Sequence, residues 1–377
     1  MTLKVMTLVG TRPEIIKLSR VIPALDAHTH HVLVHSGQNY DYELNEIFFH
    51  EMEIRKPDFF LDAARATAAE TIGEVITRTD RLLEEVRPDA FLILGDTNSC
   101  LGCIAAKRRH IPVFHMEAGN RCFDDRVPEE VNRRIIDHTS DINMPYSTIA
   151  REYLLREGIA PDRIIKTGSP MFEVLTHYQS RIDASDVLDR LALTAGEYYV
   201  VSAHREENVD SPEKLRRLVE ILNRLASESK RQIIFSTHPR TRKRLDAVGM
   251  ALHENVRAMK PLGFFDYVHL QKCATATLSD SGTITEESSI LNFPALNLRE
   301  AHERPEGMEE GAVMMTGLNP ERVFEGLEIL AHQPRGEDRL LRPVEDYQTP
   351  QVAAKVLRVV ESYGGYVVRK LYGGLGG

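Results

Sequence analysis

The stretch KVMTLVGTRPEIIK, residues 4–17, contains the pattern that decides the fold of this 377-residue chain. Lys4–Val9 is a short apolar run of the kind found in strands that are buried on both faces. Thr11 and Glu14 form a capping-box pattern and Pro13 suits a first helical turn, so we expect a helix to begin here. A strand that leads directly into a helix is the first half of a βαβ unit.

The same alternation recurs along the chain. Helical patterns such as Ala68–Val86 and Pro212–Ser227 separate short β-branched runs. This rhythm is typical of a parallel sheet covered by helices on both sides, and 377 residues are too many for one compact core. The predicted strands are Lys4–Val9, His31–His35, Ala90–Leu94, Ile111–His115, Arg163–Thr167, Tyr198–Ser202, Gln232–Ser236, Asn255–Met259, Ala276–Ser279, Ala295–Leu298 and Ala312–Thr316.

We therefore predict an α/β fold with two Rossmann-like, doubly wound parallel-sheet domains that face each other across a cleft. The first domain is expected to span residues 1–168 and the second residues 169–351, with the boundary just after the predicted strand Arg163–Thr167. Ligands of such folds bind at the carboxyl ends of the strands, so we expect the binding and catalytic residues in the loops there.

Composition limits the possible partners. The net charge of −9 argues against a general nucleic-acid partner, and neither a signal peptide nor a membrane span is expected. Cys100 and Cys103 form a C-x-x-C without a second pair, so we interpret the cysteines as reduced and predict no structural metal. These features together predict a cytoplasmic protein.

The turn after the first predicted strand carries two cations, Arg12 and Lys17, beside a helix N-terminus. Backbone N–H groups and positive charge at such a place suit a phosphate group. The G-x-G-x-x-G fingerprint is absent from this turn, so NAD is not expected.

Three acidic residues follow the central strands of the first half. Asp96 comes after Ala90–Leu94, and Glu117 comes after Ile111–His115. A single acid at such a position is often a helix cap, whereas two from neighbouring strands favour a site. Glu129 opens the next predicted helix. One interpretation of that helix is an exposed face of i,i+4 ion pairs, but its position soon after Glu117 favours convergence of the three carboxylates.

The second half places a titrating group, His204, directly after the strand Tyr198–Ser202, with an arginine beside it. The loop containing His238 repeats this arrangement more weakly. Both positions are at the mouth of the predicted sheet, where a histidine can meet a ligand.

A stronger signal is SDSGTITEES, residues 279–288, in which a strand ends in a small-residue turn that opens a helix. Ser281, Gly282 and Thr283 are expected to seat a phosphate on backbone N–H groups. Glu286 fits a capping box with Thr283, so Glu287 is the acid expected to bind a ligand, for which a ribose diol is a natural partner. Arg304 follows near the same mouth; we expect it to contribute there.

These motifs together resemble the non-hydrolysing UDP-N-acetylglucosamine 2-epimerase family, in the order of that family and over nearly the whole chain. The resemblance rests on GTRPEIIK (Gly10–Lys17), GDTN (Gly95–Asn98), HMEAGNR (His115–Arg121), PEEVNR (Pro128–Arg133), SAHREEN (Ser202–Asn208), SDSGTITEE (Ser279–Glu287) and ERPE (Glu303–Glu306).

The resemblance implies the GT-B architecture of two Rossmann-like domains, with a C-terminal helix near Val352–Tyr363 that returns residues 352–377 to the first domain. It also implies a homodimer and a UDP-sugar substrate, without a cofactor. Arg12, Ser281, Gly282 and Thr283 would hold the diphosphate, and Glu287 would hold the ribose. The groups around the sugar and the leaving group would be Lys17, Asp96, Glu117, Glu129, His204 and Arg304.

Two stretches depart from the family pattern. Ser281-Gly282-Thr283 replaces Ser-Gly-Gly, and residues 38–41 read Gln-Asn-Tyr-Asp where the family has Gln-His-Arg-Glu. The latter stretch helps bacterial members to bind an activating second UDP-N-acetylglucosamine, so its loss argues against such activation. The sequence looks closest to the UDP-N-acetyl-L-fucosamine synthase branch, which epimerises UDP-2-acetamido-2,6-dideoxy-L-talose for capsule or O-antigen.

The implied reaction is C2 inversion by elimination of UDP to a glycal, followed by re-addition, with Asp96, Glu117 and Glu129 as the acid and base candidates. Three other interpretations remain open at this stage. They are epimerisation of UDP-N-acetylglucosamine to the manno sugar, a GT-B glycosyltransferase, and a catalytically silent nucleotide-sugar sensor.

Overall fold

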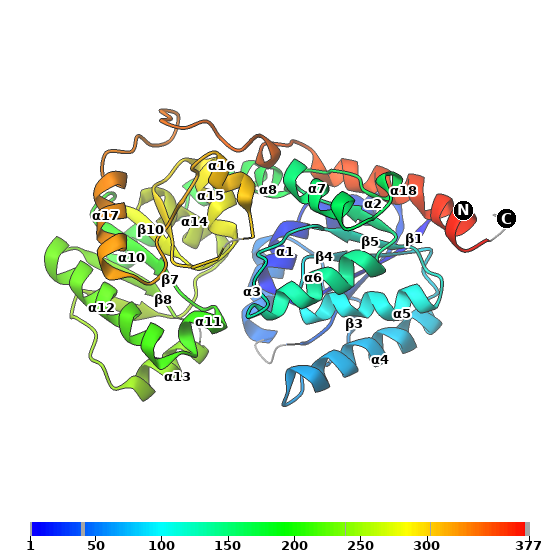
Figure 1. Ribbon diagram of the computed structural model, residues 1–377, viewed down its shortest axis with the longest axis horizontal. Coiled ribbons are helices and arrows are strands. Elements are labelled where there is room, and N and C mark those ends of the chain that lie inside the picture. The colour runs from blue at the N-terminus through cyan, green and yellow to red at the C-terminus, as the bar shows by residue number, and fades with distance from the viewer. Residues whose placement is uncertain (1, 39–41, 238, 302, 374–377) are drawn as a thin grey trace. The chain divides into compact units, whose positions relative to one another are not determined.

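The computed structural model describes residues 2–38, 42–237, 239–301 and 303–373, and Figure 1 shows its helices and strands. The chain divides into two compact units. Unit 1 comprises Met1–Thr176 and Asp346–Gly377, and unit 2 comprises His177–Glu345. Residues 39–41 of the departing stretch and His238 lie outside the described residues.

The sheet of unit 1 is parallel, with the strand order β3-β2-β1-β4-β5-β6. Val5 in β1 pairs with His31 on one side and with Ala90 on the other. The chain winds outward from β1 in one direction and from β4 in the other, so the order reverses between these two strands. The strands are β1 (Lys4–Val9), β2 (His30–His35), β3 (Phe59–Phe60), β4 (Ala90–Leu94), β5 (Val113–Met116) and β6 (Ile142–Met144).

Unit 2 repeats this arrangement. Its parallel sheet has the order β12-β11-β10-β7-β8-β9, which reverses between β7 and β10. Both units therefore have the strand order of a Rossmann-like sheet, and each has one topological switch point where ligands bind. The strands are β7 (Tyr198–Ser202), β8 (Gln232–Ser236), β9 (Val256–Met259), β10 (Ala276–Ser279), β11 (Ala295–Asn297) and β12 (Met314–Met315).

Helices connect the strands and cover the sheets (Figure 1). In unit 1 they are α1 (Arg12–Leu18), α2 (Val21–His28), α3 (Tyr42–Glu51), α4 (Ala68–Val86), α5 (Cys103–Arg108), α6 (Pro128–Thr139), α7 (Thr148–Arg156), α8 (Met171–His177) and α18 (Val352–Leu371), which packs against α2. In unit 2 they are α9 (Gln179–Asp183), α10 (Val187–Leu191), α11 (Glu206–Val209), α12 (Pro212–Ser229), α13 (Pro239–Val248), α14 (Phe264–Cys273), α15 (Thr283–Leu291), α16 (Pro305–Glu309) and α17 (Pro320–Leu330).

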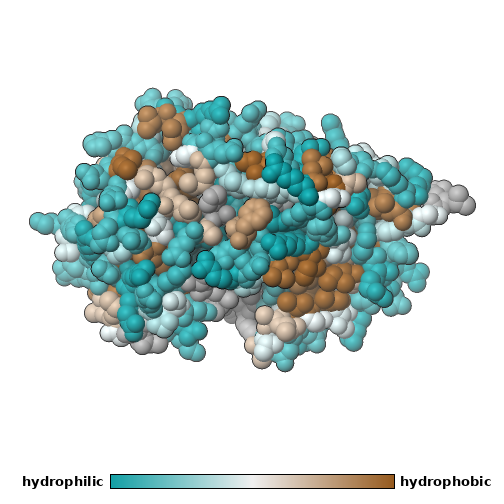
Figure 2. Space-filling model, viewed as in Figure 1, coloured by the Kyte–Doolittle hydropathy of each residue, from teal (hydrophilic) through white to brown (hydrophobic). Residues whose placement is uncertain are grey.

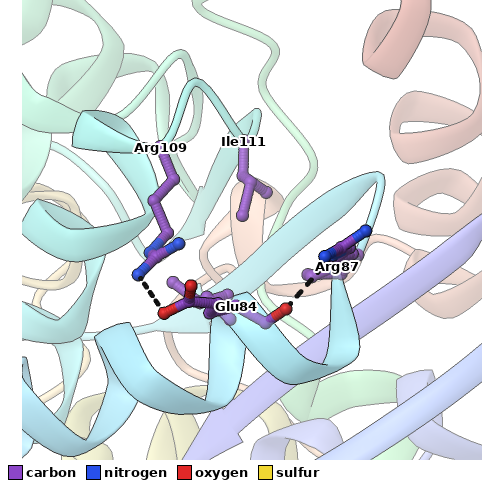
Figure 3. A pocket seen from close by; sticks show the side chains of 6 residues that line it. Glu84, Arg87, Arg109 and Ile111 are labelled. Carbon is purple, nitrogen blue, oxygen red and sulfur yellow. Dashed lines mark hydrogen bonds and ion pairs between the residues drawn. The ribbon is translucent and has the colours of Figure 1, made fainter.

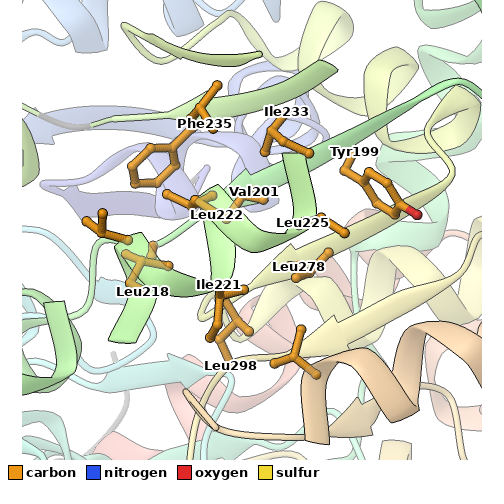
Figure 4. Packing of buried hydrophobic residues seen from close by; sticks show 14 of the residues in the cluster. Tyr199, Val201, Leu218, Ile221, Leu222, Leu225, Ile233, Phe235, Leu278 and Leu298 are labelled. Carbon is orange, nitrogen blue, oxygen red and sulfur yellow. The ribbon is translucent and has the colours of Figure 1, made fainter. Parts of the chain in front are cut away.

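Buried aliphatic side chains hold each helix layer on its sheet. In Figure 4, Leu218, Leu222 and Leu225 of α12 point toward Val201 and Phe235 of the strands. Each fully buried leucine of this kind contributes about 1.5–3 kcal/mol of hydrophobic stabilisation. The packed layers therefore provide a rigid base from which the loops at the strand ends are positioned.

The predicted fold class, an α/β protein with two doubly wound parallel sheets of the GT-B type, is confirmed. The predicted strand Arg163–Thr167 is wrong: Pro161–Arg163 forms a 3-10 turn and Ile164 makes only an isolated bridge to Asn143. Ile165 and Thr167 donate backbone hydrogen bonds to the carbonyl oxygens of Asn143 and Pro145, so the segment runs along the edge of β6 without forming a strand. The short strands Phe59–Phe60 and β6 itself escape prediction because two or three residues show no periodicity.

The surface is largely hydrophilic, with apolar groups in scattered patches (Figure 2). One such patch lies over α6, where Val131 and Ile135 are exposed. Among the described residues, no helix is both long enough and apolar enough to cross a bilayer.

Candidate active site

At the switch point of unit 1, a buried carboxylate joins the loops that follow β1 and β4. Glu14 accepts a hydrogen bond from the Thr97 hydroxyl at 2.6 Å and from the backbone N–H of Thr11 at 3.0 Å. The backbone N–H of Gly10 donates to the same carboxylate. Burial raises the pKa of Glu14 to about 7, although these hydrogen bonds act in the opposite direction. The predicted capping box of α1 is confirmed, and Glu14 has this second contact as well.

Glu117 pairs with Lys17 in the same unit. The Nζ atom of Lys17 lies 2.6 Å from Oε2 of Glu117, and the two side chains are only 3% and 12% exposed. The ammonium also lies 5.4 Å from the centre of the Tyr146 ring. Glu117 has a φ of 64°, in the left-handed region that a residue with a side chain adopts only when its surroundings enforce it.

Asp96 is held by a cation from α6. Nε of Arg133 lies 2.8 Å from Oδ2 of Asp96, while Nη1 of Arg133 donates to Glu130 at 2.9 Å. Asn132 adds a bond to the Asp96 carbonyl oxygen at 2.9 Å. Arg133 is buried, so the exposed i,i+4 pairing that sequence spacing offered as an alternative for this helix is wrong. Glu129 occupies the first turn of α6 and is half-buried.

A second buried network supports the loop that carries Glu117. Asp137 accepts from Arg121 Nη1 at 2.7 Å and from the backbone N–H of Gly119 at 3.2 Å. His115 lies between Asp137, 2.9 Å from Nδ1, and the Gly95 carbonyl oxygen, 2.8 Å from Nε2. Burial acts to raise the pKa of Asp137, but the bonds from His115 and Arg121 hold it below its ordinary value.

At the switch point of unit 2, the loops after β7 and β10 meet at Asp280. This fully buried carboxylate accepts from the backbone N–H groups of His204 and Arg205 and from the side chain of Asn208. Nδ1 of His204 lies 3.2 Å from Oδ1 of Asp280. Sequence analysis did not single out Asp280, although its position between a strand end and a small-residue turn is a signal that could have found it.

The small-residue turn leads into α15, of which Gly282 is the N-cap. Ser281 and Thr283 place their hydroxyl oxygens 3.1 Å apart at this end. A Cβ on Gly282 would lie 3.2 Å from a carboxylate oxygen of Glu303, so this position leaves little room for a side chain. The backbone N–H groups of Ser281 and Thr283 donate to serine hydroxyls within the turn, which stands at a helix N-terminus.

The predicted capping box between Thr283 and Glu286 is wrong. Thr283 is the first helical residue, and Glu286 instead accepts from Arg304, at 3.1 Å from Nε and 2.9 Å from Nη2. Both residues are buried. Glu287 is also buried and accepts from Gln271 at 2.9 Å. Spacing alone cannot identify a partner that lies 18 residues away.

The site residues thus fall into two groups. Arg12, Lys17, Asp96, Glu117 and Glu129 belong to unit 1, where Arg12 begins α1 and stacks over the Phe48 ring. The group in unit 2 comprises His204, Ser281, Gly282, Thr283, Glu287 and Arg304.

A separate surface pocket of about 300 Å³ lies away from these loops. Its labelled residues in Figure 3 are Glu84, Arg87, Arg109 and Ile111. Arg87 and Ile111 precede β4 and β5, so this pocket is at the amino edge of the sheet, opposite to the edge where doubly wound folds bind ligands.

Two doubly wound sheets with polar loops at both switch points define a GT-B-type α/β protein with its functional residues at the strand carboxyl ends. Residues 23–361 match the family model described as UDP-N-acetylglucosamine 2-epimerase. The chain belongs to this family, and the protein is an isomerase of the epimerase type.

Three relatives illustrate the match. The structure of UDP-N-acetylglucosamine 2-epimerase from Rickettsia bellii is 50% identical, with a TM-score of 0.93 over 99% of this chain and 100% of that chain. The Methanocaldococcus jannaschii UDP-GlcNAc 2-epimerase, solved in complex with UDP-GlcNAc and UDP, is 32% identical, with a TM-score of 0.88 over 95% and 99%. The UDP-2,3-diacetamido-2,3-dideoxy-D-glucuronate 2-epimerase of Pseudomonas aeruginosa is 30% identical over 86% of this chain and 91% of its own length.

Proposed function

We propose that this protein inverts C2 of a UDP-bound 2-acetamido sugar by eliminating UDP and adding it back. The observation that carries the proposal is the Lys17–Glu117 pair, in which a partly buried acid at a strand end, on a left-handed backbone, lies 2.6 Å from a buried ammonium. Such a residue is costly for stability and is expected where chemistry requires it. Family membership supports the same reaction type.

The chemistry explains why several acids are needed. The C2 proton of an acetamido sugar is not next to a carbonyl, so a base alone does not remove it. Departure of UDP from C1 builds positive charge on that carbon and makes the neighbouring proton acidic. Loss of this proton gives a glycal with a flat C2. UDP then bonds again to C1 while a proton arrives at C2 from the opposite face.

In this proposal unit 1 supplies the proton transfer. Asp96, Glu117 and Glu129 are the groups that remove and return the proton and stabilise the cationic transition state. Lys17 and Arg133 hold Glu117 and Asp96, respectively, in fixed orientations. Positioned acids and bases of this kind typically accelerate a reaction by about 10²–10⁴-fold.

Unit 2 holds the leaving group in the same proposal. The Ser281-Gly282-Thr283 turn at the N-terminus of α15 binds the diphosphate, and Glu287 binds the ribose. His204 and Arg304 contact the diphosphate from the adjoining loops, and Arg12 contributes a further positive charge from unit 1. Holding UDP after bond cleavage favours its return to C1 over its escape.

We propose UDP-2-acetamido-2,6-dideoxy-L-talose as the substrate and UDP-N-acetyl-L-fucosamine as the product. The phrases HSGQNYDYELNEIFF, AGNRCFDDRVPEE and SDSGTITEESSILNFPA support this branch. The second candidate is UDP-N-acetylglucosamine, which the 50% identity to the Rickettsia bellii protein of that name favours.

Incubation of the full chain with each UDP-sugar in heavy water, followed by NMR, tests the reaction and the substrate together. The expected result is inverted product carrying deuterium at C2, formed without an acceptor and faster from one of the two sugars. Stereochemical inversion without deuterium at C2, or turnover only when an acceptor sugar is added, would overturn the proposal.

The homodimer expected from the family resemblance is likewise proposed. Sedimentation equilibrium of the full chain tests it directly, and a mass that stays at 42.7 kDa across micromolar concentrations would contradict it.

A further inference from the structure

Asp280 is a buried carboxylate that the proposed reaction does not use directly. Its two oxygens accept from the backbone N–H of His204, at 3.1 and 3.0 Å, and from that of Arg205 at 3.0 Å. Nδ2 of Asn208 donates to it at 3.2 Å. The carboxylate therefore fixes the backbone of the loop that carries His204.

The same carboxylate faces the imidazole ring of His204. Nδ1 lies 3.2 Å from Oδ1, within hydrogen-bonding distance. A carboxylate only accepts, so a hydrogen bond at this contact places a hydrogen on Nδ1. The neutral ring then keeps its lone pair on Nε2, and the His204 side chain is 44% exposed whereas Asp280 is fully buried.

Asp280 is also the first residue of the turn expected to bind phosphate. Its backbone N–H donates to the Ser202 carbonyl oxygen at 3.1 Å, and Ser281 follows it directly. One residue therefore joins the loop after β7 to the turn before α15. The position of the imidazole relative to Ser281, Gly282 and Thr283 is set within unit 2 by Asp280.

We propose that Asp280 is a positioning residue that keeps the hydrogen of the neutral His204 ring on Nδ1, so that Nε2 faces the diphosphate and, once protonated, donates to a phosphate oxygen. This proposal rests on the proposed function for the identity of the ligand, but the tautomer itself does not. In water the Nε2–H tautomer of histidine is the commoner one, so removal of the acceptor is expected to reverse the preference.

The first test measures the tautomer of His204 by long-range ¹H–¹⁵N NMR on the full chain with ¹⁵N-labelled histidine, at a pH where the ring is neutral. His204→Gln identifies the signal. We expect Nδ1–H in the native protein and a shift toward Nε2–H in Asp280→Asn. An Nε2–H tautomer in the native protein would overturn the proposal, whether or not Asp280→Asn folds.

Glu303→Gln is the matched control for this measurement. Glu303 is a second buried carboxylate of unit 2, and it accepts from Arg299 and from Arg205 Nη2. It is expected to leave the His204 tautomer unchanged. A shift as large as that of Asp280→Asn would show that any loss of buried charge moves the ring, which would overturn the specific role of Asp280.

The second test is a double-mutant cycle on turnover. Asp280→Asn is expected to lower kcat on the order of 10²-fold, and the Asp280→Asn/His204→Gln double variant is expected to be no slower than His204→Gln alone. Fully additive losses would overturn the proposal. If no UDP-sugar is epimerised at all, the proposed function fails, while calorimetric UDP affinity and the tautomer still report on Asp280.

Discussion

At each switch point a buried carboxylate links the ends of two neighbouring strands, but the carboxylate follows a different strand in each unit. In unit 1, Glu14 lies in the first turn of α1, directly after β1, and accepts from Thr97 in the loop after β4. In unit 2, Asp280 belongs to the loop after the fourth strand and accepts from the loop after the first. The linking carboxylate therefore follows the first strand of unit 1 but the fourth strand of unit 2.

What surrounds each carboxylate separates the two sites chemically. Near Glu14 the strand ends carry two further acids. Asp96 pairs with Arg133 and Glu117 pairs with Lys17, and both cations are buried. Beside Asp280 the strand ends carry a helix N-terminus and an imidazole. One strand order therefore serves proton transfer in unit 1 and anion binding in unit 2 in our proposal, and the loops alone make the difference.

The largest expected effect is a loss of turnover without a loss of UDP binding, which separates proton transfer in unit 1 from anion binding in unit 2. Glu117→Gln removes a proton-transfer group but keeps the side-chain shape, so kcat is expected to fall by about 10³-fold while UDP affinity, measured by calorimetry, stays within about twofold. Glu152→Gln, on the exposed surface of α7, is the control and should match the native kcat. A near-native rate for Glu117→Gln would remove this residue from the mechanism.

The next effect concerns stability in unit 2. Glu286→Gln removes a carboxylate that pairs with the buried guanidinium of Arg304, which is expected to cost about 3–5 kcal/mol in urea unfolding. Glu310→Gln breaks an exposed pair with Arg342 and is expected to cost less than about 1 kcal/mol. Equal losses of unfolding free energy in the two variants would mean that burial does not determine how much these ion pairs stabilise the protein.

A pH effect belongs to unit 1. Because burial raises the folded-state pKa of Glu14 from 4.5 to about 7, the folded state binds a proton more tightly than the unfolded chain does. The resulting stabilisation is fully present below pH 4.5 and is lost as pH rises toward 7, a change of about 3 kcal/mol. Urea unfolding at pH 5 and pH 8 should show this loss in the native protein and not in Glu14→Gln. An unchanged difference in the variant would assign the pH dependence to other groups.

The smallest effect compares two serines at helix N-termini of unit 2. Ser281→Ala removes a hydroxyl from the turn before α15 and is expected to weaken UDP binding about tenfold, with little change in kcat. Ser211→Ala removes the N-cap of α12, so it is expected to lower stability by about 1 kcal/mol and leave UDP affinity unchanged. Weaker UDP binding in both variants would point to a general loss of order.

Long, strongly patterned segments were predictable from the sequence. Ala68–Val86 is a helix over that whole range because an amphipathic stripe and a Thr67–Glu70 capping box act together. The strand ends that carry Asp96 and His204 were likewise predictable, since β-branched runs and their polar followers are local features. The strands that were missed are the two-residue β3 and the three-residue β6.

The partners of charged residues were not predictable in the same way. The spacing pointed to ion pairs of Arg133 with Glu129 or Asp137, whereas the structure shows bonds to Glu130 on the same helix and to Asp96, 37 residues away. Glu286 was predicted to cap a helix but holds Arg304. Buried ion pairs between distant residues are decided by which strands become neighbours, and that information is not contained in any local window.

The chain path has a consequence for synthesis. Unit 2 is one continuous segment, His177–Glu345, whereas unit 1 needs α18, which is translated after that segment. On the ribosome, unit 2 is therefore translated completely before unit 1 is. The apolar face of α2 in unit 1 stays uncovered until α18 has been synthesised. A ribosome stalled at about residue 345 would carry a chain in which unit 2 is complete and unit 1 still lacks α18. The exposed face of α2 in this nascent chain is a surface that chaperones can bind.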